Sequence, residues 1–121
     1  MGIGIVQVNH VNVTVPAELE QAAKHFYGEV VGLKQIPKPV GPRQFVGAWY
    51  ELGNSQLHLS IEDDPQNAVS NRHVCYGVAD LAVAETKLRD AGVEIIADPA
   101  QRFFVRDPAG NLIEITERSA R

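Results

Sequence analysis

The sequence contains little of what several classes of protein require. Its 121 residues include a single cysteine, Cys75, which excludes an internal disulfide and is typical of a protein that works in a reducing cytoplasm. The net charge is −4 and no run of Lys or Arg occurs, so neither nucleic acid nor an anionic membrane is an expected partner. The longest apolar runs are far shorter than the roughly 20 residues of a membrane helix, and no signal segment is expected.

The sequence does contain an internal repeat, because two stretches follow the same pattern. The stretches "HVNVTVPAELEQAAKHFYGEVVGL" and "HVCYGVADLAVAETKLRDAGVEI" both open with His-Val, continue as an alternating strand and enter a helical pattern. Hydrophobic residues make up 45% of the chain and charged residues 21%, as in globular proteins. We therefore expect a single domain over residues 1–121, built from one module at about 5–62 and another at about 71–118. The polar stretch "EDDPQNAVSN" would link them.

The spacing of apolar residues predicts one helix in each module. In the first, apolar side chains recur at three- and four-residue steps from Pro16 to about Val31, and proline suits a first helical turn. In the second, the pattern covers about Leu81–Ala91, with Asp80 as the N-cap and Gly92 as the stop.

Three short strands are expected after each helix. In the first module they are "KQIPK", "FVGAWYEL" and "SQLHLSIE", and the last two form a hairpin around Gly53 and Asn54. In the second they are "EIIA", "RFFVR" and "NLIEIT", with a hairpin around "DPAG". The opening "MGIGIVQVNHV" also alternates like a strand. Each module therefore has the order strand, helix and three strands. This repeated order predicts an α+β protein with mixed or antiparallel sheets and helices on one face.

Four side chains that can coordinate a metal fall at equivalent places of the two modules. Alignment pairs His10 with His73 in the first strands, and His58 with Glu114 in the last strands. Because strand side chains alternate, each of the four lies on the more polar face of its strand, opposite residues that can pack under the helices. In "NHVNVTV", Asn12 shares the face of His10. These faces are expected to line one shared cavity.

Imidazole and carboxylate donors together suit divalent Fe, Mn, Ni, Co or Zn, among which the sequence does not choose. His10, His73 and Glu114 could form a 2-His-1-carboxylate face, and His58 would add a fourth ligand. Open positions would let a substrate chelate through two oxygens while the ion stabilises an enolate or oxyanion. A lone strand histidine is more often a packing or surface residue, a description that fits His25 in the first helix. Four candidates at equivalent positions favour a metal site.

Other residues are candidates for the wall of this cavity. Trp49 and Tyr50 lie on opposite sides of their strand, as do Phe103 and Phe104, so one of each pair could face inward. Packing in the core is the alternative for all of them. The predicted pocket residues are Asn12, Trp49, Cys75 and Phe104.

Charged and acid–base candidates are less defined. Arg102 and Arg106 share a face with Phe104; an inward Arg would suit a carboxylate or phosphate, and a solvated Arg is the alternative. Tyr50 and Glu51 could act as acid or base, but no catalytic residue is identified. Cys75 has no basic neighbour on its face that argues for a depressed pKa.

The segments "NHVNVTV", "NRHVCYGVADL" and especially "FFVRDPAGNLIEIT" resemble the vicinal oxygen chelate superfamily, which includes glyoxalase I, extradiol dioxygenases and bleomycin-resistance proteins. The last segment matches an ending in which "DPxGN" precedes two hydrophobic residues and Glu. The resemblance covers nearly the whole chain. It implies two βαβββ modules whose mixed sheet curls around a metal cup, with ligands at His10, His58, His73 and Glu114.

The sequence also departs from particular members. Where bacterial glyoxalase I has a glutamate that usually serves as a base, this chain has His58, and the first module lacks an obvious glutathione-binding insert. Extradiol dioxygenases are usually longer, with a second-sphere His and Tyr that are not assignable here. Bleomycin-resistance proteins lack the metal ligands that this chain keeps.

Two functions of different classes follow from the resemblance. One is a metal-dependent lyase, isomerase or dioxygenase-like enzyme that chelates vicinal oxygens of a small substrate. The other is a protein that sequesters a small molecule or antibiotic without catalysis; a degenerate site without metal is a third outcome. Many small members are homodimers that build each cup from two chains, so a homodimer is expected. Whether the four ligands meet within one chain or across two chains stays open.

Overall fold

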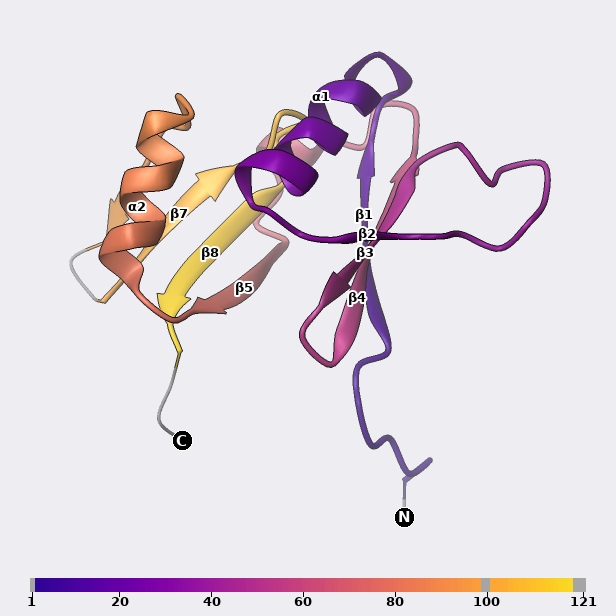
Figure 1. Ribbon diagram of the computed structural model, residues 1–121, viewed down its shortest axis with the longest axis horizontal. Helices are drawn as coiled ribbons and strands as arrows, with labels where there is room; N and C mark the ends of the chain where they lie inside the picture. Colours follow the sequence, from indigo (N-terminus) through magenta and orange to yellow (C-terminus); the bar gives the residue numbers. More distant parts are fainter. Residues whose placement is uncertain (1, 99–100, 119–121) are drawn as a thin grey trace.

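The computed structural model describes residues 2–98 and 101–118, and these form two four-stranded sheets with few helices (Figure 1). The first half contains β1 (His10–Val15), η1 (Ala17–Leu19), α1 (Glu20–His25), η2 (Phe26–Val30), β2 (Gln35–Ile36), β3 (Ala48–Leu52) and β4 (Ser55–Ile61). The second half contains η3 (Asn67–Val69), β5 (His73–Val78), α2 (Leu81–Asp90), β6 (Ile96–Asp98), β7 (Arg102–Arg106) and β8 (Leu112–Glu117). The predicted α+β class, with strand, helix and three strands in each half, is confirmed.

The two sheets have the same topology. The first sheet has the order β1-β4-β3-β2 and the second sheet the order β5-β8-β7-β6. In each, the first strand runs parallel to the last and the remaining pairs are antiparallel, so both sheets are mixed. Within the described part of the chain the sheets stay separate and unclosed, instead of joining into the single curled sheet that was expected.

One face of each sheet forms the hydrophobic core. In the first sheet Tyr50, Leu57 and Leu59 are buried with Phe26 and Tyr27 of the helical segment. In the second, the buried face packs with Leu88 of α2, which covers it in Figure 1; this face contributes Phe103, Val105, Ile113 and Ile115. The alternation of side chains therefore turns the other face of each sheet outward.

The first helix spans almost the predicted range, but it is not uniform. It begins after Pro16 as the 3₁₀ turn η1, continues as α1 and ends in a π turn, in which the Val31 N–H donates to the Phe26 carbonyl at 2.8 Å. The wider turn accommodates two consecutive buried aromatic residues, Phe26 and Tyr27. The second helix follows the prediction, since the Asp80 carboxylate accepts from the Val83 N–H at 3.1 Å.

A buried polar joint connects the two halves. The Tyr27 hydroxyl donates to Asp107 Oδ2 at 2.6 Å, and Asn111 Nδ2 donates to the same oxygen at 2.8 Å. The backbone N–H groups of Ala109 and Asn111 each donate to Asp107 Oδ1 at 2.9 Å, so the buried carboxylate is fully bonded. The amides of Asn67 and Asn111 both donate to the Thr14 carbonyl. The "DPAGN" segment thus holds the second sheet against β1 and the first helix.

The opening residues do not form a strand, although their alternation suggested one. β1 begins at His10, and residues 2–9 extend away from both sheets (Figure 1). The pairing of β1 with β4 extends by one hydrogen bond before His10, in which the Gln56 N–H donates to the Asn9 carbonyl at 3.2 Å. A strand needs a neighbouring strand for its backbone groups, and the described part of this chain supplies none for residues 2–8.

Candidate functional site

Three stacked rings cover the open face of the first sheet. The His10 and His58 rings lie 4.0 Å apart, centroid to centroid, with 16° between their planes. Trp49 is the cross-strand neighbour of His58, and their rings also lie 4.0 Å apart at 2°. Because β4 lies between β1 and β3, His58 is the middle ring of the layer. Trp49 therefore faces the candidate ligands, whereas Tyr50 lies in the core.

The two histidines of this layer have different hydrogen bonds. His10 Nδ1 contacts Asn9 Oδ1 at 2.9 Å; an amide oxygen only accepts, so His10 Nε2 keeps its lone pair for a ligand. His58 Nε2 donates to Gln56 Oε1 at 2.8 Å, and this amide would have to turn away for that nitrogen to bind an ion. Burial, with smaller effects of His10 and Lys38, lowers the pKa of His58 and favours the neutral form that metals bind.

A histidine and a carboxylate meet on the open face of the second sheet. His73 Nε2 lies 3.2 Å from Glu114 Oε1, and His73 Nδ1 donates to the Asn71 carbonyl at 2.9 Å. With Nδ1 carrying a proton, Nε2 either carries a second proton or presents a lone pair toward the carboxylate. A proton or a metal cation between the two atoms makes this contact favourable.

Other side chains surround Glu114. Its second oxygen lies 3.3 Å from Arg102 Nη1, and the ring of Phe104 lies 6.1 Å from that of His73. Partial burial and the neighbouring Glu114 raise the pKa of the Cys75 thiol, while Arg102 opposes them. A raised pKa lowers the fraction of thiolate, which is the nucleophilic form of cysteine.

The donor atoms of the His73–Glu114 pair fit a divalent ion. Two donors at about 2.1 Å from one ion and at right angles to each other lie about 3.0 Å apart, close to the His73–Glu114 separation of 3.2 Å. The structure does not bring the two pairs together, however. Among residues 2–98 and 101–118, no group of three or more His, Cys, Asp or Glu side chains is close enough to hold a metal. One chain therefore presents two half-sites, His10–His58 and His73–Glu114. His25, at the end of α1, is exposed.

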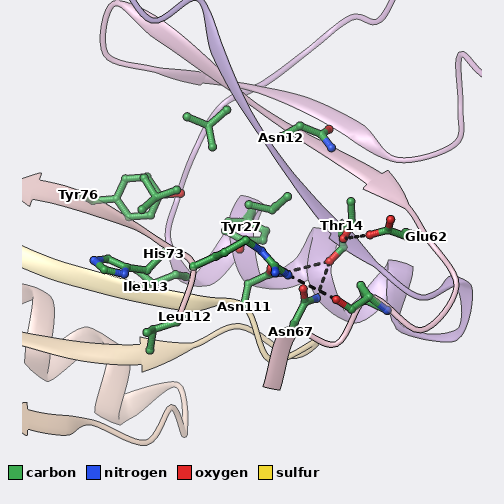
Figure 2. A pocket seen from close by; sticks show the side chains of 15 residues that line it. Asn12, Thr14, Tyr27, Glu62, Asn67, His73, Tyr76, Asn111, Leu112 and Ile113 are labelled. Atoms are coloured by element: carbon green, nitrogen blue, oxygen red, sulfur yellow. Dashed lines mark hydrogen bonds between the residues drawn. The ribbon is translucent and has the colours of Figure 1, made fainter. Parts of the chain in front are cut away.

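A cleft of about 460 Å³ lies between β1 and β5 (Figure 2). Asn12 and His73 line it; Asn12 Nδ2 also donates to Ser60 Oγ at 2.9 Å. Its apolar lining includes Val11, Val13, Val74, Tyr76 and Ile113, and its polar lining includes Thr14, Tyr27, Glu62, Asn67, Arg72 and Asn111. His58, Trp49, Cys75, Phe104 and Glu114 do not line it, so this cleft is not the predicted cup.

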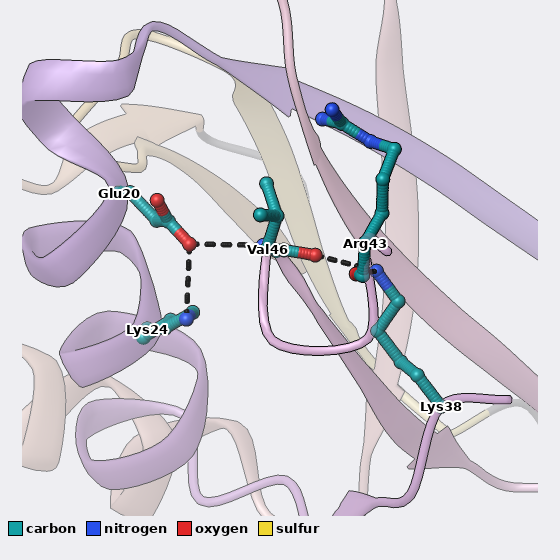
Figure 3. A network of polar contacts seen from close by, with 6 residues as sticks. Glu20, Lys24, Lys38, Arg43 and Val46 are labelled. Atoms are coloured by element: carbon teal, nitrogen blue, oxygen red, sulfur yellow. Dashed lines mark hydrogen bonds and ion pairs between the residues drawn. The ribbon is translucent and has the colours of Figure 1, made fainter. Parts of the chain in front are cut away.

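Hydrogen bonds and an ion pair hold the loop that connects β2 to β3, the strand that bears Trp49 (Figure 3). They fix where β3 begins. Lys38 Nζ donates to the carbonyls of Arg43 and Val46. Glu20 Oε2 accepts from the Gly47 N–H at 2.9 Å and from Lys24 Nζ at 3.0 Å. The Gly47 N–H is the largest cause of a lowered pKa for Glu20.

Two partners of the ligand pairs were not identified from the sequence. Gln56 lies two residues before His58 and on the same side of β4, which is the signal that could have found it. Asn71 contributes its backbone carbonyl to His73, and side-chain alternation does not indicate such a partner. Of the two candidate arginines, Arg102 contacts Glu114, whereas Arg106 donates to the carbonyls of Gly110 and Asn67. The side chain of Tyr50 is buried, and Glu51 is exposed.

Comparison with known proteins gives a consistent result. The family model of the glyoxalase/bleomycin resistance protein/dioxygenase superfamily matches residues 7–115. A glyoxalase family protein from Bacillus anthracis is 34% identical, with 98% of this chain and 100% of that chain covered and a TM-score of 0.87. No curated protein sequence matches.

Two more distant structures share the fold. A lactoylglutathione lyase from Agrobacterium tumefaciens is 22% identical, with 92% of each chain covered and a TM-score of 0.69. TnmS3, an antibiotic binding protein from Streptomyces sp. CB03234, is 21% identical, with 98% of this chain and 100% of that chain covered and a TM-score of 0.72. Separately, no helix in residues 2–98 and 101–118 has the length and apolar character needed to cross a membrane.

Proposed function

Because the chain belongs to the glyoxalase/bleomycin resistance protein/dioxygenase superfamily, we propose that it is a metal-dependent enzyme acting on a small substrate with two neighbouring oxygen atoms. One observation carries this proposal: two sheets of identical topology each turn a pair of ligand-type side chains onto the open face. The reaction would be of the lyase, isomerase or dioxygenase type. The single cysteine suits the reducing cytoplasm as its location.

The separation of the half-sites supports a site shared by two chains. His10 and His58 of one chain would meet His73 and Glu114 of the partner subunit in a homodimer. A two-fold axis makes the arrangement reciprocal, so a dimer would contain two equivalent sites. Three imidazoles and one carboxylate would then leave positions open in an octahedral ion.

The groups around the pairs prepare them for this role. The Asn71 carbonyl and the Asn9 amide each contact Nδ1, of His73 and of His10, and so would leave Nε2 of each ring for an ion. Arg102 holds one oxygen of Glu114 and leaves the other beside His73. When bound there, a divalent ion would act as a Lewis acid for two substrate oxygens and for the negative charge that develops on them.

A second candidate function is sequestration of a small molecule without catalysis. The stacked layer of Trp49, His58 and His10 on an open sheet face favours it, because a planar ligand can extend such a stack. TnmS3 shows that the same fold occurs in an antibiotic binding protein. Such a protein would keep its ligand affinity after treatment with a chelator, whereas the enzyme would lose activity.

The deciding experiment is elemental analysis of the parent protein, His10→Ala and Glu114→Ala, after loading with each candidate ion. The proposal expects about one ion per chain in the parent and a loss in both variants. Absence of metal from the reconstituted parent would overturn the enzyme and favour the binding protein.

Mixing the two variants tests the shared site. A mixed dimer of His10→Ala and Glu114→Ala would carry both lesions in one site and none in the other. With random exchange half of the dimers are mixed, so the mixture should recover about one quarter of the parental metal. A site built within one chain would be damaged in every chain, and the mixture would recover none.

A further inference from the structure

One segment of the first half is basic, although the chain as a whole is acidic. Residues 30–50 contain Lys34, Lys38 and Arg43 and no Asp or Glu, whereas the net charge of the chain is −4. Lys38 and Arg43 both belong to the β2–β3 loop, residues 37–47. A local excess of positive charge attracts anions to that part of the surface.

Lys38 is a half-buried cation without a carboxylate partner. Its Nζ donates to the carbonyls of Arg43 and Val46 (Figure 3). No carboxylate of residues 2–98 and 101–118 forms an ion pair with it. An ammonium group has three donors, so one remains after the two carbonyls are bonded. A charge that is partly removed from water is stabilised by an anion beside it, and Lys38 therefore favours a bound anion.

Hydrogen bonds hold the loop in place around this ammonium group. The two carbonyls that accept from Lys38 lie three residues apart in the loop, and the Glu20 carboxylate accepts from the Gly47 N–H at 2.9 Å. The same carboxylate is paired with Lys24. The loop thus presents its cations from an ordered backbone, and an anion would not have to order that backbone on binding.

The β2–β3 loop begins beside the first half-site. Ile36, at the end of β2, is the cross-strand neighbour of Trp49, and Trp49 is that of His58. Directly paired residues point to the same face, so the end of β2 adjoins the open face that carries the stacked rings. Lys38 follows Ile36 by two residues. After burial and the neighbouring His10, its charge is the next cause of the lowered pKa of His58, which agrees with this placement.

Arg43 supplies a second cation. Only its backbone carbonyl takes part in the contacts that hold the loop (Figure 3), and its side chain is exposed. Within the described part of the chain it has no ion pair either. A guanidinium group can donate two parallel hydrogen bonds to a carboxylate or a phosphate. Phe45, with an exposed fraction of 84%, offers apolar surface in the same loop.

We infer that the β2–β3 loop binds a carboxylate or phosphate group of the substrate through Lys38 and Arg43. The inference rests on the proposed function, because the ion would chelate the two neighbouring oxygens at the other end of the same molecule. The substrate is then a small anion whose charged group lies apart from the oxygens that bind the ion.

The test titrates the 121-residue chain, labelled with ¹⁵N and freed of metal, with phenylphosphonate, benzoate and uncharged benzyl alcohol. Removing metal isolates the loop from an ion that would itself bind anions. One or both anions should shift the backbone amide signals of residues 37–47, and the tighter one identifies the preferred group. Benzyl alcohol should bind at least about 10-fold more weakly. Equal affinity for the alcohol, or shifts confined to the second sheet, would overturn the inference.

Charge-removing variants test the two residues. Lys38→Gln and Arg43→Gln should each weaken binding of the tighter anion about 10-fold, because each loses a charge-assisted hydrogen bond. Lys38→Arg keeps the charge and should restore most of the affinity. The side chain of Arg43 does not hold the loop, so a loss in Arg43→Gln does not come from a disordered loop.

Lys87→Gln, on the exposed side of α2, is the matched control for net charge and should change the affinity less than about 2-fold. A loss as large in Lys87→Gln, or no loss in Lys38→Gln and Arg43→Gln, would overturn the inference. Binding of phosphatidylserine vesicles without binding of either soluble anion would also overturn it and would identify a membrane-binding loop.

Metal analysis separates this inference from the proposed function. Lys38→Gln and Arg43→Gln should keep the parental metal content, because neither residue is a proposed ligand. A metal-binding parent whose loop binds neither anion would overturn the anion site alone. A parent that binds no metal but binds an anion through Lys38 and Arg43 would support the anion site and overturn the enzyme.

Discussion

The two halves of the chain share one backbone plan but surround their ligand-type side chains differently. In the first sheet His58 is buried between the rings of His10 and Trp49, and burial lowers its pKa. In the second sheet the exposed His73 faces the carboxylate of Glu114. One half therefore offers two imidazoles in a stacked layer, and the other offers an imidazole beside a carboxylate with an ionic neighbour.

This difference shows that the strand topology and the chemical surroundings of the candidate residues are determined by different parts of the sequence. The parallel pairing of the first and last strands fixes where the candidate residues lie in each sheet. Their neighbours then decide protonation and charge. If the proposed ion binds, the second half should contribute more to its affinity, because it alone supplies a negative charge.

Replacing the charged donor should have the largest effect on metal affinity. Glu114→Gln keeps the shape of the side chain but removes its charge, and we expect an affinity loss of about 1,000-fold. His58→Gln removes a neutral donor and should cost about 30-fold. Competition with a chelator of known affinity measures both losses.

Glu51→Gln, at an exposed position of β3, is the control for removing a carboxylate elsewhere and should leave metal affinity unchanged. Equal losses for Glu114→Gln and His58→Gln would remove the distinction between the two halves. A loss for Glu51→Gln as large as that for Glu114→Gln would show a nonspecific effect of net charge.

The loop before β3 distinguishes the halves in a second way. Gly47 has φ +71°, and a Cβ atom at this position would lie 2.0 Å from the Leu59 carbonyl oxygen. Gly47→Ala should lower the free energy of unfolding by about 3 kcal/mol or more, because neither the backbone nor β4 can yield cheaply. Chemical denaturation measures this loss. Trp49, the single tryptophan, should change its fluorescence as β3 shifts.

Gly41→Ala is the matched control in the same loop. A Cβ there would meet no atom within 4 Å in the described part of the chain, so we expect a change below about 0.5 kcal/mol. A Gly47→Ala protein as stable as Gly41→Ala would mean that the loop does not fix the start of β3.

The faces of the strands were predictable from the sequence, because they depend only on local alternation. The pattern of "NHVNVTV" placed His10 and Asn12 opposite the valines, and the burial of β1 agrees. The choice between adjacent aromatics was not predictable in this way. Packing under the helices made Tyr50 and Phe103 core residues and left Trp49 and Phe104 on the open faces.

The separation of the half-sites could not be read from the sequence. Alternation assigns a side chain to a face of its own sheet, but the placement of one sheet relative to the other depends on contacts distant in the chain. Here the joint between Tyr27 and Asp107 spans 80 positions. The "DPAGN" segment that indicated the superfamily forms this joint, and its residue Asn111 also lines the cleft.

Removing the hydroxyl that joins the halves should have an intermediate effect. Tyr27→Phe leaves buried Asp107 without one of its donors, and we expect the free energy of unfolding to fall by about 2 kcal/mol. Tyr50→Phe is the control, because the buried Tyr50 hydroxyl has no hydrogen-bond partner in the described structure. That change should be neutral or slightly stabilising. Equal losses in urea denaturation would show that the joint adds nothing beyond packing.

The smallest effect is expected from the charge of Glu20, which ties the first-half loop to the helix. The Gly47 N–H holds the pKa of this carboxyl below its ordinary value of 4.5, so folding favours the ionised form. Its contribution is therefore complete above the ordinary pKa and is lost as the pH falls through the lowered value. Glu20→Gln should be about 1 kcal/mol less stable than the parent at pH 7, and the difference should vanish in acid.

The matched variant for this last measurement is Lys24→Gln, which removes the ion pair but keeps the Gly47 donor. Because the Gly47 N–H is the largest single cause of the lowered pKa, Lys24→Gln should remove only part of the pH-dependent difference. Urea denaturation of the single and double variants between pH 3 and pH 7 separates the two contributions. If Lys24→Gln removes the whole pH-dependent difference in stability, the surface ion pair is what holds the loop. The first half would then also depend on an ionic contact, and the two halves would differ less than the structure indicates.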